Sequence, residues 1–190
     1  MAGLLSVSYY LVSLFFSLIL FVSWMRFVLR YFRVSHLHPM ASAIYQLTDP
    51  LFLRFDRLVY QRYLPRYDGV TFAGIVLLEV IKFLILGLIV YHRVLPVSYL
   101  TLLTLGSLIT LPCDLLFYAI LIRMLLSWVN PIWQQHPLAE LLIRITEPSI
   151  RFGHKILPNI SGFDFSPMVM LIILKVITMF ITASMPVPLL

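Results

Sequence analysis

Long apolar stretches dominate this sequence and restrict what it can fold into. A helix needs about 20 consecutive, mostly apolar residues to cross a bilayer, and four segments approach or exceed that length with few charges. We predict membrane-spanning helices over residues 4–28, 70–90, 111–129 and 165–183. Hydrophobic residues make up 61% of the chain and charged residues only 12%, which is far from the composition of a soluble domain. The sequence therefore predicts an all-α integral membrane protein with four transmembrane helices.

The third apolar stretch is too long for one straight crossing. As a single helix, residues 95–128 would extend roughly 50 Å, whereas the hydrocarbon core of a bilayer is about 30 Å thick. Gly106 and Pro112 are the residues within it that least favour a continuous helix. We therefore predict a short interfacial segment over residues 98–109, followed by the third transmembrane helix.

The positive charges gather in two connecting segments. Between the first and second spans stand Arg26, Arg30, Arg33, Arg54, Arg57, Arg62 and Arg66, and between the third and fourth stand Arg144, Arg151 and Lys155. We expect the first three to lie at the lipid headgroups, where the first span ends. Because cations are retained in the cytoplasm, we predict that the loops over residues 36–66 and 130–163 are cytoplasmic and that both termini are periplasmic. The net charge of +6 then serves orientation and lipid contact, and we expect no nucleic-acid binding.

The two halves of the chain repeat the same short polar motifs. At an offset of 98 residues, His38-Pro39 matches His136-Pro137, and Thr48-Asp49-Pro50 matches Thr146-Glu147-Pro148. After five extra residues in the first half, Lys82 matches Lys175. We predict two parallel internal repeats, residues 1–95 and 96–190, each a membrane helix, a cytoplasmic loop and a second membrane helix.

Each loop is expected to contain short amphipathic helices. Pro39 and Pro137 suit the first position of one helix. The Thr-acid pairs suit the cap of a second helix that opens with Pro50 or Pro148. We expect the second helices to lie on the inner leaflet, with Arg54, Arg57, Arg151 and Lys155 available to anionic lipid. The alternative is that these helices pack on the bundle and that water solvates their charges.

The second half also carries a recognisable motif. It consists of Ser127-Trp128, Asn130-Pro131, Thr146-Glu147-Pro148, Arg151, Lys155, Pro158 and the run Gly162-Phe163-Asp164-Phe165-Ser166-Pro167. In these residues, and over both halves, the chain resembles the YggT family of bacterial inner-membrane proteins. It departs from the family pattern at Phe152 and His154. The resemblance implies a multi-pass inner-membrane protein without established enzymatic activity, associated with osmotic stress tolerance, with the neighbourhood of the division site or with assembly of membrane complexes.

Four charged residues fall inside the predicted spans. Glu79 and Lys82 are three residues apart on one helix face and can form an ion pair. Lys175 needs another partner, and Asp114 is the available acid if the third and fourth spans pack together. Because an unpaired charge in the bilayer centre costs about 3 kcal/mol, we expect both lysines to be shielded from lipid. These charges either join the two repeats, or form a site for an ion, a proton or an anionic substrate, or snorkel to the outer interface.

The motifs of common catalytic and metal sites are absent from the sequence. There is no Walker loop, GxGxxG, GxSxG or HExxH motif. His36 and His38 have no acid or cysteine at ligand spacing, and Cys113 is the only cysteine. Asp164 is better placed to cap the helix after it than to act as a catalytic acid. We therefore predict no metal, no cofactor and no catalytic residue.

The leading hypothesis is a non-enzymatic membrane protein whose basic cytoplasmic loops dock on the anionic inner leaflet and on partner proteins of the membrane, of division or of assembly. Self-association into a homo-oligomer is compatible with it. The alternative is a small channel or transporter subunit that moves an ion or solute along the intramembrane charges. An intramembrane enzyme ranks last, because the sequence offers no paired nucleophile and base.

Overall fold

A computed structural model describes residues 2–35, 38–59, 68–129, 136–157 and 164–185. This part of the chain contains six helices: α1 (Ala2–Tyr31), α2 (Pro39–Val59), α3 (Gly69–Tyr91), α4 (Val97–Val129), α5 (Pro137–Ile156) and α6 (Ser166–Ala183). Four of them, α1, α3, α4 and α6, are long and apolar enough to cross a membrane. The all-helical architecture with four candidate spans is confirmed.

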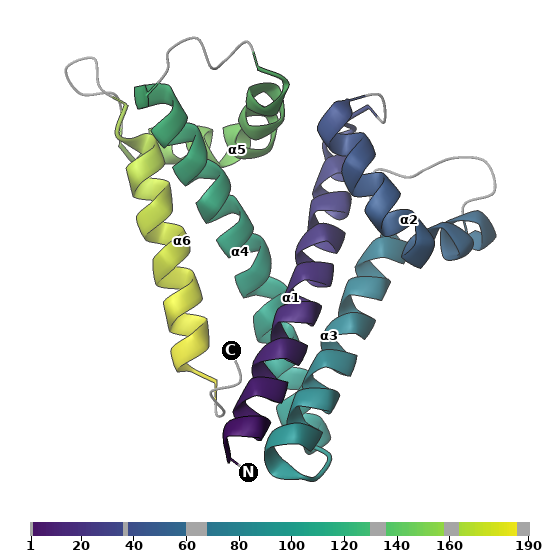
Figure 1. The fold of residues 1–190 in the computed structure, drawn as a ribbon. Coiled ribbons are helices and arrows are strands. Elements are labelled where there is room, and N and C mark those ends of the chain that lie inside the picture. The colour runs from purple at the N-terminus through teal and green to yellow at the C-terminus, as the bar shows by residue number, and fades with distance from the viewer. Residues whose placement is uncertain (1, 36–37, 60–67, 130–135, 158–163, 186–190) are drawn as a thin grey trace.

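The long helices pack in two pairs. Helix α1 runs along α3, and α4 runs along α6, while α3 also meets α4 and connects the pairs (Figure 1). Leu20, Ile75 and Leu115 form a buried apolar cluster among α1, α3 and α4, and Ile120 and Leu174 do the same between α4 and α6. The other two helices, α2 and α5, lie toward the end of the bundle opposite the start of α1 and the end of α6 (Figure 1).

Large apolar side chains also cover the outside of the bundle. Leu11, Phe15 and Leu18 of α1 are each more than half exposed, as are Ile172 and Phe180 of α6. Such a surface is far larger than the apolar patches of soluble proteins. These faces suit lipid, in agreement with a multi-pass membrane protein.

Helix α4 corrects the prediction of a break at Gly106 and Pro112. A single helix runs from Val97 to Val129 with Pro112 inside it, so residues 98–109 do not form a separate interfacial segment. Leu103 and Ser107 of this first part are buried in the bundle. Proline is tolerated in membrane helices because neighbouring helices and Ser or Thr hydroxyl groups satisfy the freed backbone groups. Helix α4 packs against both α3 and α6.

The loops correct a second prediction, because each forms one helix instead of two. Pro39 and Pro137 begin α2 and α5 as expected, but Pro50 and Pro148 lie inside these helices. The Thr48 and Thr146 hydroxyl groups do not cap a new helix. They donate to the carbonyl oxygens one turn earlier, of Ile44 at 2.8 Å and Leu142 at 2.6 Å. A backbone already in the helical conformation allows this bond, and the bond in turn keeps the hydroxyl group on the buried face.

The end of α1 places two of the three arginines within the helix. The helix continues past Arg26 and Arg30 and ends at Tyr31. Arg33 takes a left-handed conformation with φ of 51°, and the amide of Val34 donates back to the carbonyl of Leu29 at 3.0 Å. Arg26 is buried within the bundle, at 1% exposure.

Candidate functional site

Arg26 connects the first membrane helix to α2. Its guanidinium Nη1 donates to Thr48 Oγ1 at 2.7 Å and to Asp49 Oδ1 at 2.8 Å, and its side chain is only 1% exposed. The rings of Tyr45 and Phe52 flank the guanidinium, with centroids 5.4 and 5.6 Å from its carbon. A buried arginine with two acceptors and two aromatic neighbours fixes where α2 crosses α1. We call Arg26, Thr48 and Asp49 the first arginine clamp.

Arg123 makes the same connection in the second half. Its Nη1 donates to Thr146 Oγ1 at 2.8 Å, and its Nη2 lies 3.3 Å from Glu147 Oε2. We call Arg123, Thr146 and Glu147 the second arginine clamp. In both clamps an arginine near the end of a membrane helix binds the Thr-acid pair that precedes a proline.

Arg123 lies in a stretch that its apolar pattern predicts only as a membrane span, so the role of this arginine was not predicted from the sequence. A signal was present. Arg123 precedes Thr146 by 23 residues, and Arg26 precedes Thr48 by 22. A cation at matching distances before two copies of one motif indicates a shared contact.

The second clamp opens onto the outer face of α5. Arg151 Nε donates to the other oxygen of the same carboxylate, Glu147 Oε1, at 3.2 Å. Burial raises the pKa of Glu147, but the hydrogen bonds donated by Arg151 and Arg123 lower it by more. The pKa of Glu147 is therefore below its ordinary value of 4.5. Glu147 therefore stays ionised between two cations.

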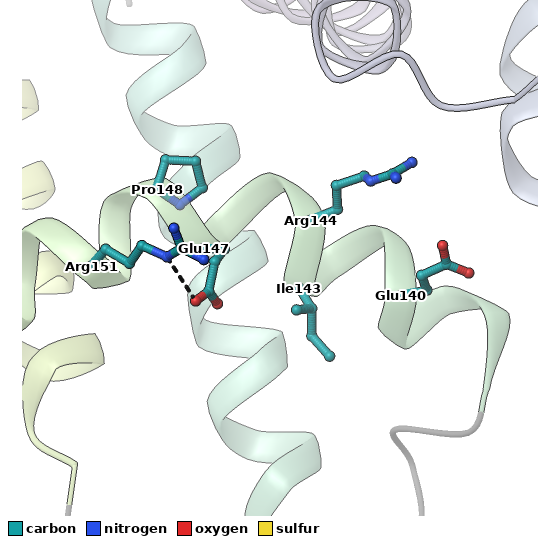
Figure 2. Close-up of a pocket in the computed structure, with 6 residues that line it drawn as sticks. All are labelled: Glu140, Ile143, Arg144, Glu147, Pro148 and Arg151. Atoms are coloured by element: carbon teal, nitrogen blue, oxygen red, sulfur yellow. Dashed lines mark hydrogen bonds and ion pairs between the residues drawn. The ribbon is translucent and has the colours of Figure 1, made fainter.

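A groove of about 720 Å³ follows this face of α5, lined by Glu140, Ile143, Arg144, Glu147, Pro148 and Arg151. Figure 2 shows Arg151 joined to Glu147 across one turn, with Arg144 and Glu140 further along the same helix. Lys155 is exposed one turn beyond Arg151. The opposite face of α5 is apolar and buried through Ala139, Leu142 and Ile150. The predicted basic residues Arg151 and Lys155 thus lie on an exposed charged face.

The corresponding residues of the first loop are only partly described. Helix α2 extends through Arg54 and Arg57, but their side chains lie outside the described part of the structure. Pro158 and Gly162 of the family motif also lie outside the described residues.

The remaining motif residues join α5 to α6. The Ser166 amide donates to Asp164 Oδ1 at 2.9 Å, so Asp164 supports the start of α6, where Pro167 stands in the first turn. His154 Nε2 of α5 lies 3.3 Å from the same Asp164 oxygen. These contacts hold the C-terminal end of α5 against the beginning of α6.

The intramembrane charges divide into a buried pair and a more exposed one. Lys82 Nζ lies 3.5 Å from Glu79 Oε2, and the two side chains are 5% and 0% exposed. Ser107 of α4 is buried beside the Glu79 carboxyl group. This cluster lies between the helix pairs, where α3 meets α4.

Lys175 is less enclosed than we expected. Its side chain is exposed on α6, with Nζ 5.7 Å from the centroid of the Phe117 ring and within electrostatic range of Asp114 on α4. The expectation that both lysines are shielded is therefore wrong for Lys175.

The helical architecture, the four apolar spans and the clamped helices at one end define a multi-pass membrane protein. The CCB3/YggT family model matches residues 5–91 and again residues 102–185, and the chain belongs to this family. An uncharacterized protein of Pseudomonas aeruginosa is 30% identical over 188 residues, which cover 95% of this chain and 91% of that protein. The uncharacterized protein YggT of Escherichia coli is 26% identical over 174 residues, covering 90% of this chain and 86% of that one. No solved structure matches the chain.

Proposed function

We propose that this protein is a non-enzymatic scaffold or assembly factor of the bacterial inner membrane. It contributes to stress tolerance, such as osmotic tolerance, by holding partner proteins at the cytoplasmic surface. The placement of α5 is the observation that most supports the scaffold proposal. One face of this helix is buried, the second arginine clamp fixes its direction, and the opposite face exposes Arg144, Arg151 and Lys155. A helix held in this way offers a preformed charged surface at little entropic cost on binding.

The proposal includes a duplicated architecture. Two parallel repeats, each a membrane helix, a loop helix and a membrane helix, are supported by the matching arginine clamps and by the two matches to one family model. Because each repeat crosses the membrane twice, both loop helices then lie on one side. The arginines of the loops favour the cytoplasm for that side and the periplasm for the termini.

The partners follow from the charge of the exposed face. Arg144, Arg151 and Lys155 interact with the anionic headgroups of the inner leaflet, while the alternation with Glu140 and Glu147 favours a protein surface that also carries both signs. Partners of this kind are membrane proteins of division or of complex assembly, or a second copy of this chain.

Photocrosslinking from α5 tests the scaffold proposal. Benzoylphenylalanine replaces Phe152, which is 55% exposed on α5, and in a matched control it replaces Phe180, which is 73% exposed on the lipid-facing surface of α6. In native membranes we expect reproducible protein adducts from position 152 and mainly lipid adducts from position 180. An absence of protein adducts at position 152 would contradict the scaffold function.

A second candidate function is a channel or transporter subunit. The observation that favours it is the buried Glu79 carboxyl group, whose Oε1 has no hydrogen-bond partner among the described residues. Intramembrane ionisable groups commonly mark ion or proton pathways. Flux of protons or monovalent ions into reconstituted vesicles, lost in Glu79→Gln, would replace the scaffold proposal by this one.

A further inference from the structure

The described part of α2 exposes an apolar stripe. Met40, Ala43, Leu47 and Leu51 follow one another at helical spacing, and all four are exposed, Leu47 at 66%. An interfacial helix facing water would expose charges along such a stripe. This surface of α2 therefore needs an apolar environment.

Helix α5 has its own apolar stripe, but the chain itself covers it. Ile145 stands directly before Thr146-Glu147-Pro148, as Leu47 stands directly before Thr48-Asp49-Pro50. Ile145 and Leu141 are only 2% and 4% exposed, because they pack against Leu29, Val34 and Tyr45 of the first half. The matching positions of α2, Leu47 and Ala43, remain uncovered.

Two grooves accompany the uncovered stripe where α2 crosses the membrane helices. Leu47 and Leu51 form one groove of about 190 Å³ with Leu18, Ile19 and Val22 of α1. Leu51 and Phe52 form a second groove of about 450 Å³ with Ala73, Gly74 and Leu77 of α3. Both grooves have walls that are almost entirely hydrocarbon.

Gly74 allows the second groove to form. A Cβ atom at this position would lie 2.3 Å from Cε1 of Phe52, so only glycine lets the Phe52 ring rest directly on α3. The ring then fixes α2 against α3, while Leu51 is left on the outer side of the crossing.

We propose that acyl chains of the phospholipids in the adjacent leaflet occupy both grooves, so that α2 is inserted among the lipid chains while the charged face of α5 stays at the aqueous surface. The first groove is continuous with the lipid-facing side of α1, since Leu18 lines it and is 58% exposed. The second groove reaches the exposed side of α3 through Leu77, which is 60% exposed. A second copy of the chain fits less well. The surface that covers the matching stripe of α5, around Leu29 and Val34, is already filled by Leu141 and Ile145 of the same chain.

Spin labels measure which solvent reaches each helix. The full chain, with Cys113→Ala to remove the natural thiol, carries a nitroxide at Leu47→Cys or Leu51→Cys, and in matched controls at Arg144→Cys or Arg151→Cys. The proteins are reconstituted into vesicles of phosphatidylcholine and phosphatidylglycerol. We expect collisions with oxygen to exceed collisions with a water-soluble nickel chelate at positions 47 and 51, and the reverse at positions 144 and 151.

Occupancy of the α2–α3 groove is tested by narrowing it. Ala73→Leu is expected to lower the oxygen collision rate of the label at position 51 and to leave the label at position 47 unchanged. An unchanged rate at position 51 would show that no chain enters that groove. Nickel-dominated collisions at position 47 would place α2 in water, and low collision rates with both reagents would show a protein neighbour. Any of these three results overturns the proposal.

Discussion

The two arginine clamps differ in how well water reaches them. The Arg26 side chain is 1% exposed and that of Arg123 is 22% exposed, while the two acids are similarly exposed, Asp49 at 37% and Glu147 at 35%. Removing one partner of a buried pair leaves an uncompensated charge and costs about 3 kcal/mol or more, whereas exposed pairs contribute at most about 1 kcal/mol. Because Arg26 is the more buried arginine, we expect Asp49→Asn to lower the free energy of unfolding more than Glu147→Gln, for which about 1 kcal/mol or less is expected.

Thermal unfolding of both variants in one detergent measures this difference. Because Asn and Gln keep the size of the side chains they replace, changes in packing are small and the lost charge dominates. Equal shifts of the unfolding midpoint in the two variants would mean that burial of Arg26 is not what distinguishes the clamps.

The lowered pKa of Glu147 gives the second clamp a defined pH dependence. A carboxyl group whose pKa is lower in the folded state stabilises that state above its unfolded pKa, and the contribution is lost as the pH falls through the folded pKa. We expect the contact between α5 and Arg123 to weaken below the ordinary glutamate value of 4.5. The mobility of a spin label at Glu140→Cys should rise in that range, and in Glu147→Gln it should be raised already at neutral pH. A label whose mobility is independent of pH in both proteins would contradict this role.

Variants of Glu79 and Lys82 distinguish a structural role of this ion pair from a functional one. Glu79→Gln leaves Lys82 buried without its counterion, so we expect a loss of several kcal/mol of stability. Replacing both residues, as Glu79→Leu with Lys82→Met, removes both desolvation costs and should recover most of it. Recovered stability with unchanged cellular function fits a structural pair. Recovered stability with lost function would instead assign the pair to a transport or binding site.

At the scale of the elements, α5 and α6 meet at a point with no spare volume. A Cβ atom on Gly153 would lie 2.8 Å from the backbone oxygen of Ser166. Backbone cannot give way as a flexible side chain can, so Gly153→Ala is expected to cost about 1–3 kcal/mol of stability. Gly3→Ala is the control, because nothing lies within 4 Å of the added atom and the helical preference of alanine favours the change. If Gly153→Ala melted no lower than Gly3→Ala, the close contact of α5 with α6 would be wrong.

Hydropathy alone was enough to predict the bounds of the second and fourth membrane helices. The second span, expected over residues 70–90, is Gly69–Tyr91, and the fourth, expected over residues 165–183, is Ser166–Ala183. The prediction that Pro50, Pro112 and Pro148 mark helix boundaries was wrong. Pro50, Pro112 and Pro148 all lie within helices, as proline can where a helix packs against neighbouring helices.

Tertiary contacts explain what the sequence did not reveal about the site. The spacing of Glu79 and Lys82 was enough to predict their contact, since both lie on one helix. Arg26 and Arg123 bind residues 22 to 24 positions later on another helix, and this pairing depends on how α2 and α5 cross the bundle. The difference between the exposed Leu47 and the buried Ile145 likewise arises only from the contact of α5 with the first half.

At the scale of the whole molecule, one apolar cluster joins the halves at the end where α2 and α5 lie. Leu29, Val34 and Tyr45 come from the first half, and Leu141 and Ile145 from the second. The polar contact of α3 with α4 joins them nearer the middle of the membrane helices. The apolar cluster lies where α2 and α5 are found at the same end of the bundle (Figure 1).

Thiol labelling in cells tests that arrangement most directly. In a Cys113→Ala background, Ser42→Cys on α2 and Glu140→Cys on α5 are treated with a membrane-impermeant maleimide, with Tyr99→Cys at the opposite end of the bundle as the control. We predict that positions 42 and 140 react only after the inner membrane is opened, while position 99 reacts in intact cells. Labelling of positions 42 and 140 from opposite sides of the membrane would contradict the account.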